Sequence, residues 1–173
     1  MKKILLYILT ISILSSCSNV GNHVPEAIEP IPTQQQIDWH KLETYAFVHF
    51  GLNTYNDLEW GFGNTPASTF NPTELDCEQW VMTLKQCGMK GVILTAKHHD
   101  GFCLYDTKGL CDYDAPHSAC GRDLIREFVD ACNKYGLMPM FYHTTLDWYN
   151  KDFYENFYED LEYLRKSVET LCK

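Results

Sequence analysis

Polar side chains follow three separate apolar runs of this chain, each at the point where the run ends. His49 follows the first run, His98, His99 and Asp100 follow the second, and residues 143–148 (HTTLDW) follow the third. Neutral imidazoles donate a hydrogen bond from one ring nitrogen and accept one at the other, so a group of them can distinguish the stereochemistry of hydroxyl groups. A single histidine is usually a satisfied structural residue, but three successive run ends of this kind predict one shared site.

The apolar runs are predicted to be β-strands, and the segments between them have the periodicity of helices. The run of residues 90–96 is continuously apolar, which is typical of a strand covered on both faces, and the run of residues 137–142 is predicted to be buried as well. The strands are expected at residues 44–50, 90–96 and 137–142, and the helices at 33–41, 76–88, 121–135 and 152–173.

Strands that alternate with helices predict right-handed βαβ units and a parallel sheet. The long loops all follow the carboxyl ends of the strands, where a (β/α)₈ barrel collects its functional residues. A doubly wound sheet would use the same end, but no glycine-rich phosphate loop follows the first strand. We therefore expect an α/β fold, a partial (β/α)₈ TIM-like barrel with about the first three β/α units, because a whole barrel needs about 250 residues.

The N-terminus has the pattern of an export signal. Lys2 and Lys3 precede an apolar stretch, Ile4–Leu14, that is too short to span a bilayer permanently. The sequence Leu-Ser-Ser before Cys17 resembles a bacterial lipoprotein signal, and an ordinary secretory signal is the alternative. The expected organisation is a signal peptide at 1–16, a tether at 17–33 that starts with lipidated Cys17, and a globular part at 34–173.

Composition excludes one class of partner. Cleavage before Cys17 would leave 12 basic against 23 acidic residues, a net charge of −11. Such a charge repels phosphate backbones, so we expect no nucleic-acid partner.

Seven cysteines remain beyond Cys17, and an odd number cannot all pair within one chain. None of them forms a Cys-x-x-Cys pair, and Cys77, Cys87 and Cys132 fall within helical patterns. Buried thiols are therefore favoured over a zinc site or a disulfide framework.

Several motifs together resemble the retaining α-L-fucosidases of glycoside hydrolase family 29. The resemblance runs in order from about Trp39 to the last residue, and the combination of motifs is highly specific. Its motifs are FVHFGLN (47–53), EWG (59–61), FNP (70–72), TAKHHDGF (95–102), GRD (121–123), Tyr142 and LDW (146–148).

The resemblance implies roles for individual residues. The three histidines of the FVHFGLN and KHHDGF motifs would hydrogen-bond the hydroxyls of fucose, while the Glu-Trp-Gly loop would close over the sugar and a tyrosine would complete the pocket. The substrate-binding set is thus His49, Glu59, Trp60, His98, His99 and Tyr142. His143 stands where relatives often carry another aromatic or a small residue, and no catalytic role is assigned to it.

A retaining glycosidase also needs a carboxylate nucleophile and an acid/base carboxyl group, about 5 Å apart. The resemblance implies that both lie downstream of Lys173, so we assign no catalytic residue here and expect this polypeptide alone to be inactive. It also implies a fucosylated glycan as substrate and no cofactor or metal. With the N-terminal pattern, it predicts an exported protein anchored by lipid to the membrane of the bacterial cell envelope.

Three other interpretations stay open. His49, His98, His99 and Asp100 could bind a metal for hydrolysis, although adjacent histidines on extended backbone diverge and neither His-x-His nor His-Glu-x-x-His occurs. The chain could instead be a non-enzymatic sugar-binding fragment, although a slice of a barrel would leave open sheet edges. A disrupted or truncated gene is the third interpretation.

Overall fold

The computed structural model describes residues 24–173. The chain divides into two units, residues 1–38 and 39–173. The predicted signal peptide and the lipidation site Cys17 lie outside the described residues. In the first unit, residues 24–33 form neither helix nor strand, and helix α2 (Gln34–Lys41) begins at its end. Within residues 24–173, no helix has the length and apolar character needed to cross a membrane.

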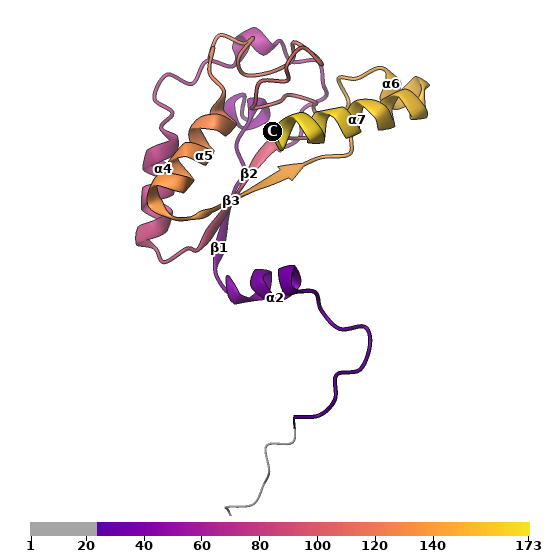
Figure 1. Cartoon of the computed structure of the whole chain (residues 1–173). Helices are drawn as coiled ribbons and strands as arrows, with labels where there is room; N and C mark the ends of the chain where they lie inside the picture. The colour runs from indigo at the N-terminus through magenta and orange to yellow at the C-terminus, as the bar shows by residue number, and fades with distance from the viewer. Residues whose placement is uncertain (1–23) are drawn as a thin grey trace, which may run out of the picture. The chain divides into compact units, whose positions relative to one another are not determined.

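The second unit is built on a parallel sheet of three strands in the order β1-β2-β3 (Figure 1). The strands are β1 (Tyr45–Val48), β2 (Gly91–Lys97) and β3 (Met138–His143). In the parallel register, Val48 lies opposite Leu94, and Thr95 lies opposite Tyr142. The carboxyl ends of all three strands therefore meet at one edge. The predicted parallel sheet is confirmed, whereas its closure into a barrel stays a prediction.

Burial differs sharply between the strands. Every residue of β2 except Ile93 is buried, so the prediction that this strand is covered on both faces is confirmed. The prediction that the third strand is buried is wrong for the residues described: β3 is only partly buried, and Met138 is 47% exposed. The reason is position, because β2 has a neighbour on each side and β3 pairs with β2 alone.

Helices α4 (Cys77–Gln86) and α5 (Leu124–Tyr135) pack against each other beside the sheet (Figure 1). Each begins at a capping aspartate: the Asp76 side chain accepts the Gln79 N–H in α4, and the Asp123 side chain accepts the Arg126 N–H in α5. Helix α5 ends at Gly136, whose left-handed φ of 69° suits a residue without a Cβ atom. The fully buried core between these elements includes Val81, Val92, Leu94, Leu124 and Phe128.

The segment between β1 and α4 holds two short helical turns that the sequence pattern did not predict. They are α3 (Leu52–Tyr55) and the 3₁₀ turn η1 (Ala67–Thr69). Phe70, directly after η1, is fully buried and packs its ring against Phe50 and Phe102. This segment is therefore packed onto the core rather than free of it.

The single helix predicted at residues 152–173 is wrong, because the structure has two helices there. They are α6 (Asp152–Glu155) and α7 (Phe157–Leu171). Asn156 separates them with an extended backbone (φ −147°, ψ 88°), which a continuous helix does not allow.

The fully buried positions of helix α7 are polar, although its apolar Leu171 also packs against the core. Its buried residues are Asp160 and Ser167, whereas Phe157 is 66% exposed. The hydroxyl of Ser167 lies 2.6 Å from the Tyr105 hydroxyl and 2.9 Å from Nε2 of His143. Polar partners on neighbouring elements therefore decide which face of α7 packs, and His143 takes part in that packing.

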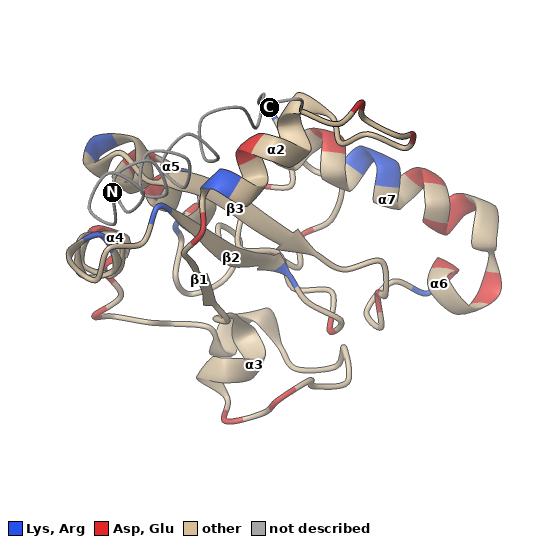
Figure 2. Cartoon of the chain, turned by 90° about the horizontal axis from the view of Figure 1, so that it is seen from below, with Lys and Arg blue, Asp and Glu red and all other residues tan. Residues whose placement is uncertain are grey.

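The opposite side of α7 carries charges of both signs (Figure 2). Arg165 pairs with Glu162 at 2.9 Å and with Glu169 at 3.0 Å, three and four residues away. These spacings place the partners on one face of a helix, where solvent screens exposed pairs and leaves them only weakly stabilising.

The cysteines follow the prediction in part. Cys77 and Cys132 are buried, as predicted, whereas Cys87 is exposed, so that prediction is wrong. Cys87 is the residue at which α4 ends, and its backbone already leaves the helix there. All seven cysteines of the described part are free thiols.

Asp123 offers a test of how α5 is positioned. Oδ1 of Asp123 caps α5, and Oδ2 of the same side chain accepts the backbone N–H of Asp106 at 3.2 Å. We expect Asp123→Ala to lower the free energy of unfolding by about 1–2 kcal/mol, measured by urea denaturation followed by circular dichroism. Asp76→Ala removes only the single capping hydrogen bond of α4, so it should lower the free energy of unfolding by less. Equal losses in both variants would contradict a role for the Asp106 contact.

Candidate active site

The residues after β2 form a tight turn that presents two histidines. An antiparallel bridge between Lys97 and Cys103 closes the turn, and the Gly101 N–H donates to the His98 carbonyl at 2.9 Å. Gly101 has a φ of +90°, and a Cβ atom there would strike the Asp147 carboxylate and the Tyr149 side chain. Glycine is therefore required where this turn passes the loop that follows β3.

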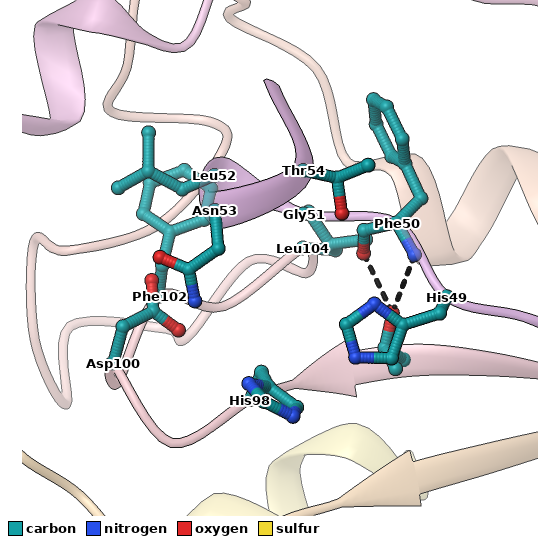
Figure 3. Close-up of a pocket in the computed structure, with 11 residues that line it drawn as sticks. His49, Phe50, Gly51, Leu52, Asn53, Thr54, His98, Asp100, Phe102 and Leu104 are labelled. Atoms are coloured by element: carbon teal, nitrogen blue, oxygen red, sulfur yellow. Dashed lines mark hydrogen bonds between the residues drawn. The ribbon is translucent and has the colours of Figure 1, made fainter. Parts of the chain in front are cut away.

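The structure brings the predicted residues of all three strand ends together. The ring of His98 lies 4.7 Å from that of His49, 4.3 Å from that of His99 and 5.8 Å from that of Tyr142, measured between centroids. Figure 3 shows His49 and His98 beside each other in the pocket. The expectation that adjacent histidines diverge is wrong, because His98 and His99 lie in a turn and not on extended strand.

Two tryptophans extend this group of rings. Trp60 and Trp148 lie 5.7 Å and 5.5 Å from the His99 ring and 6.2 Å from each other. Trp60 is 54% exposed, so a face of its ring is available to a ligand. Glu59 lines an open pocket together with Trp60, Trp148 and Tyr154. We call His49, Trp60, His98, His99, Tyr142 and Trp148 the rim cluster.

Sequence reasoning did not assign a role to some residues of this region. Phe47 is 51% exposed, and its ring lies 6.0 Å from Tyr142 and 6.5 Å from His49. Because side chains alternate along a strand, the spacing of two residues between Phe47 and His49 already puts both on one face. Tyr154 lines the pocket of Glu59 from α6, and no sequence pattern indicated that contact.

The histidines of the turn are held in the neutral form. Burial, followed by the neighbouring His99 and His49, lowers the pKa of His98 to about 4. The pKa of His99 is also lowered, by burial first and His49 second. Nδ1 of His98 is buried without a hydrogen-bond partner, whereas Nδ1 of His99 lies 2.6 Å from the Thr144 hydroxyl. A neutral His98 is thus able to donate to, or accept from, a hydroxyl group.

A buried ion pair joins the end of β2, where the histidine turn begins, to the loop that follows β3. Lys97 Nζ lies 2.5 Å from Asp147 Oδ2, and these side chains are 0% and 1% exposed. Oδ1 of Asp147 accepts the backbone N–H groups of Tyr149 and Asn150 at 3.1 and 2.9 Å. The Trp148 N–H donates to the His99 carbonyl at 2.9 Å, so the loop after β3 is attached to the histidine turn.

The carboxyl groups of the turn and of the adjoining loop are buried. Asp100 is 3% exposed, and Asp147 is 1% exposed and already paired. In residues 24–173, no group of three or more histidine, cysteine or acidic side chains is arranged to hold a metal ion. The arrangement is suited to binding a neutral, hydroxyl-rich molecule with an apolar face.

Comparisons with known proteins agree with this chemistry. Residues 23–170 match the family model described as Alpha-L-fucosidase. Alpha-L-fucosidase 1 of Arabidopsis thaliana is 36% identical over 169 residues, which cover 96% of this chain and 33% of that protein. The putative alpha-L-fucosidase of Oryza sativa subsp. japonica is 36% identical over 116 residues, covering 65% of this chain and 22% of that protein.

Solved structures give the same result. A putative alpha-L-fucosidase from Bacteroides ovatus superposes with a TM-score of 0.78 at 39% identity, covering 82% of this chain and 24% of that one. A glycoside hydrolase 29 family member from an unknown rumen bacterium has a TM-score of 0.78 at 39% identity, covering 84% and 26%. The chain thus spans about a third or less of the length of these relatives.

Removing one partner of the buried ion pair tests its role. Lys97→Met leaves Asp147 buried without its cation, so we expect a loss of about 3–5 kcal/mol in the free energy of unfolding. Adding Asp147→Asn removes the stranded charge and keeps an oxygen for the backbone N–H groups. The double variant should therefore recover part of the loss in urea denaturation, and a purely additive loss would contradict the pairing.

The protonation of His98 is testable by NMR titration of imidazole resonances. We expect His98 to stay neutral as the pH falls from 8 to 5, because its pKa is about 4. A lowered histidine pKa contributes stability above the ordinary value of 6.5, and this contribution is lost as the pH falls through about 4. His117 is the control, because Asp114 raises its pKa above 6.5. A His98 midpoint near 6.5 would contradict the assignment.

Proposed function

Because this chain belongs to the α-L-fucosidase family, we propose that the rim cluster is the sugar-binding side of an exported α-L-fucosidase that removes terminal α-L-fucose from glycans by a retaining mechanism. The observation that carries the proposal is the continuous chain of ring contacts from His49 through His98 and His99 to Trp60. It joins hydrogen-bonding rings to an exposed apolar ring in one place.

Fucose is neutral, and it offers hydroxyl groups together with an apolar face that carries a methyl group. His49, His98 and His99 hydrogen-bond the hydroxyls, because neutral imidazoles supply both a donor and an acceptor. Trp60 stacks on the apolar face, and Tyr142 completes the polar side. Contacts to hydroxyls that strengthen in the transition state contribute several kcal/mol, roughly, to catalysis.

Glu59 belongs to the loop that closes over the sugar rather than to the reacting pair. It lines the pocket beside Trp60, in the segment that follows α3. A carboxylate there accepts hydrogen bonds from sugar hydroxyls.

The reaction needs two carboxyl groups about 5 Å apart that both face the anomeric carbon. Asp100 and Asp147 are buried and face other protein groups, so neither is suited to attack a sugar. We place the nucleophile and the acid/base outside residues 1–173, on further strands of a (β/α)₈ barrel that this sheet would begin. Lipidation at Cys17 would attach the enzyme to the cell envelope.

The decisive experiment is hydrolysis of an aryl α-L-fucoside, with two proteins compared. Residues 17–173 alone should give no turnover, and the chain extended through its downstream reading frame should release the aryl alcohol. Turnover by the short chain, with a covalent intermediate trapped on one of its own carboxylates, would refute the placement of the nucleophile.

Variants of the extended chain test the rim cluster. His98→Ala should lower kcat/KM by about 10²-fold, because it removes a contact to a substrate hydroxyl that strengthens in the transition state. His117→Ala is the matched control, since His117 is an exposed histidine that pairs with Asp114 and is not a member of the rim cluster. Equal effects of the two variants would contradict the site.

A further inference from the structure

Asn53 holds the backbone of the loop that carries Trp60. The side chain is 3% exposed, and its Nδ2 donates to the Trp60 carbonyl at 2.6 Å. The backbone carbonyl of Asn53 accepts the Leu58 N–H at 2.9 Å. Gly61 has a φ of +68°, and a Cβ atom there would collide with the Asn53 amide. The loop is therefore wrapped closely around this one amide group.

The Asp100 carboxyl faces the same amide in the pocket (Figure 3). Oδ2 of Asp100 and Oδ1 of Asn53 are both buried, and neither has a hydrogen-bond partner. An ionised carboxylate and an amide oxygen are both acceptors, so they cannot satisfy each other. Rotating the amide does not solve this, because its oxygen would then point at the Trp60 carbonyl. A proton on the carboxyl does solve it.

We propose that Asp100 carries a proton and donates it to Asn53 Oδ1, so that a neutral carboxyl group positions the Trp60 loop against the His98–His99 turn. An amide and a protonated carboxyl group are complementary, since each has one donor and one acceptor on the facing side. Asp100 is thus a positioning residue: it acts on Trp60 through Asn53 and does not touch the ligand.

The surroundings of Asp100 favour the neutral form. Burial raises its pKa to about 7, and the Asp147 carboxylate adds to the rise, against backbone N–H groups and the Asn53 amide, which lower it. The single buried cation nearby, Lys97, is engaged by Asp147 at 2.5 Å. The other titratable groups around the turn are His49 after β1, His98, His99 and Cys103 after β2, Tyr113 from the segment before α5, and Tyr149 from the loop after β3.

The sign of the pH dependence follows from this pKa. An acid whose folded pKa is raised contributes stability fully below its ordinary value of 3.8, and this contribution is lost as the pH rises through about 7. Above that pH, a buried charge faces an amide oxygen, and the attachment of the Trp60 loop weakens. A corresponding loss of sugar affinity above pH 7 rests on the proposed function, whereas the protonation of Asp100 does not.

Asp100→Asn mimics the protonated carboxyl group at every pH, because the introduced amide N–H can donate to Asn53 Oδ1 and does not titrate. In the full chain, we expect the melting temperature of Asp100→Asn to exceed that of the unchanged protein by a margin that grows from pH 5 to pH 8. Asp147→Asn is the matched control and should lower the melting temperature throughout, because Lys97 loses its counter-charge.

The protonation is also measured directly, in the full chain without sugar, by ¹³C NMR of the aspartate carboxyl carbons. We expect one carboxyl to titrate with a midpoint near 7 and to be absent from the spectrum of Asp100→Asn. A midpoint near 4 for Asp100 would overturn the proposal. So would an Asp100→Asn variant that is unfolded, or one that is less stable than the unchanged protein by the same margin at every pH. None of these results depends on fucosidase activity.

Discussion

The buried pair between Lys97 and Asp147 is the interaction on which the geometry of the site depends. Lys97 is the last residue of the central strand, and Asp147 lies in the loop after the next strand, with both side chains at most 1% exposed. Ions removed from water are tolerated only when they are paired and hydrogen-bonded, so the two segments are held in one arrangement. Because Asp147 also accepts two backbone N–H groups, the arrangement fixes the path of the loop that carries Trp148.

Next to Lys97 of this charged pair, the two histidines of the turn are kept uncharged. Burial, and after it the neighbouring imidazoles, lower the pKa values of His98 and His99, so these two rings lie side by side without a net charge. Uncharged rings of this kind bind a neutral ligand without a large desolvation cost for fixed charges. Lys97 of the buried ion pair and His98 of the rim cluster are therefore consecutive residues of the chain.

The sequence predicted the sheet and the convergence at its edge, because parallel strands and their loops leave a strong periodic signal. The rim residues His49, His98, His99 and Tyr142 lie together as predicted. Their roles in binding sugar, like the export signal, the domain boundaries and the barrel, stay predictions. The burial of Ser167 in α7 was not predictable from hydrophobicity. Its hydroxyl is buried because it hydrogen-bonds the Tyr105 hydroxyl and the His143 imidazole, which are far away in the sequence. The ion pair of Lys97 with Asp147 likewise joins residues 50 positions apart, so only the tertiary structure reveals it.

The balance of buried charge connects the ion pair with the state of Asp100. Lys97, Asp100 and Asp147 are all at least 97% shielded from solvent, and they lie within one small region of the fold. One ammonium group can neutralise one carboxylate, and Asp147 holds it at 2.5 Å. A second ionised carboxyl beside the pair would be a buried charge without a counter-charge, which proteins avoid by shifting the pKa until the group is neutral. The ion pair that fixes the Trp148 loop thereby makes Asp100 available as a neutral donor to the Trp60 loop, so both tryptophans are positioned by carboxyl groups in opposite protonation states.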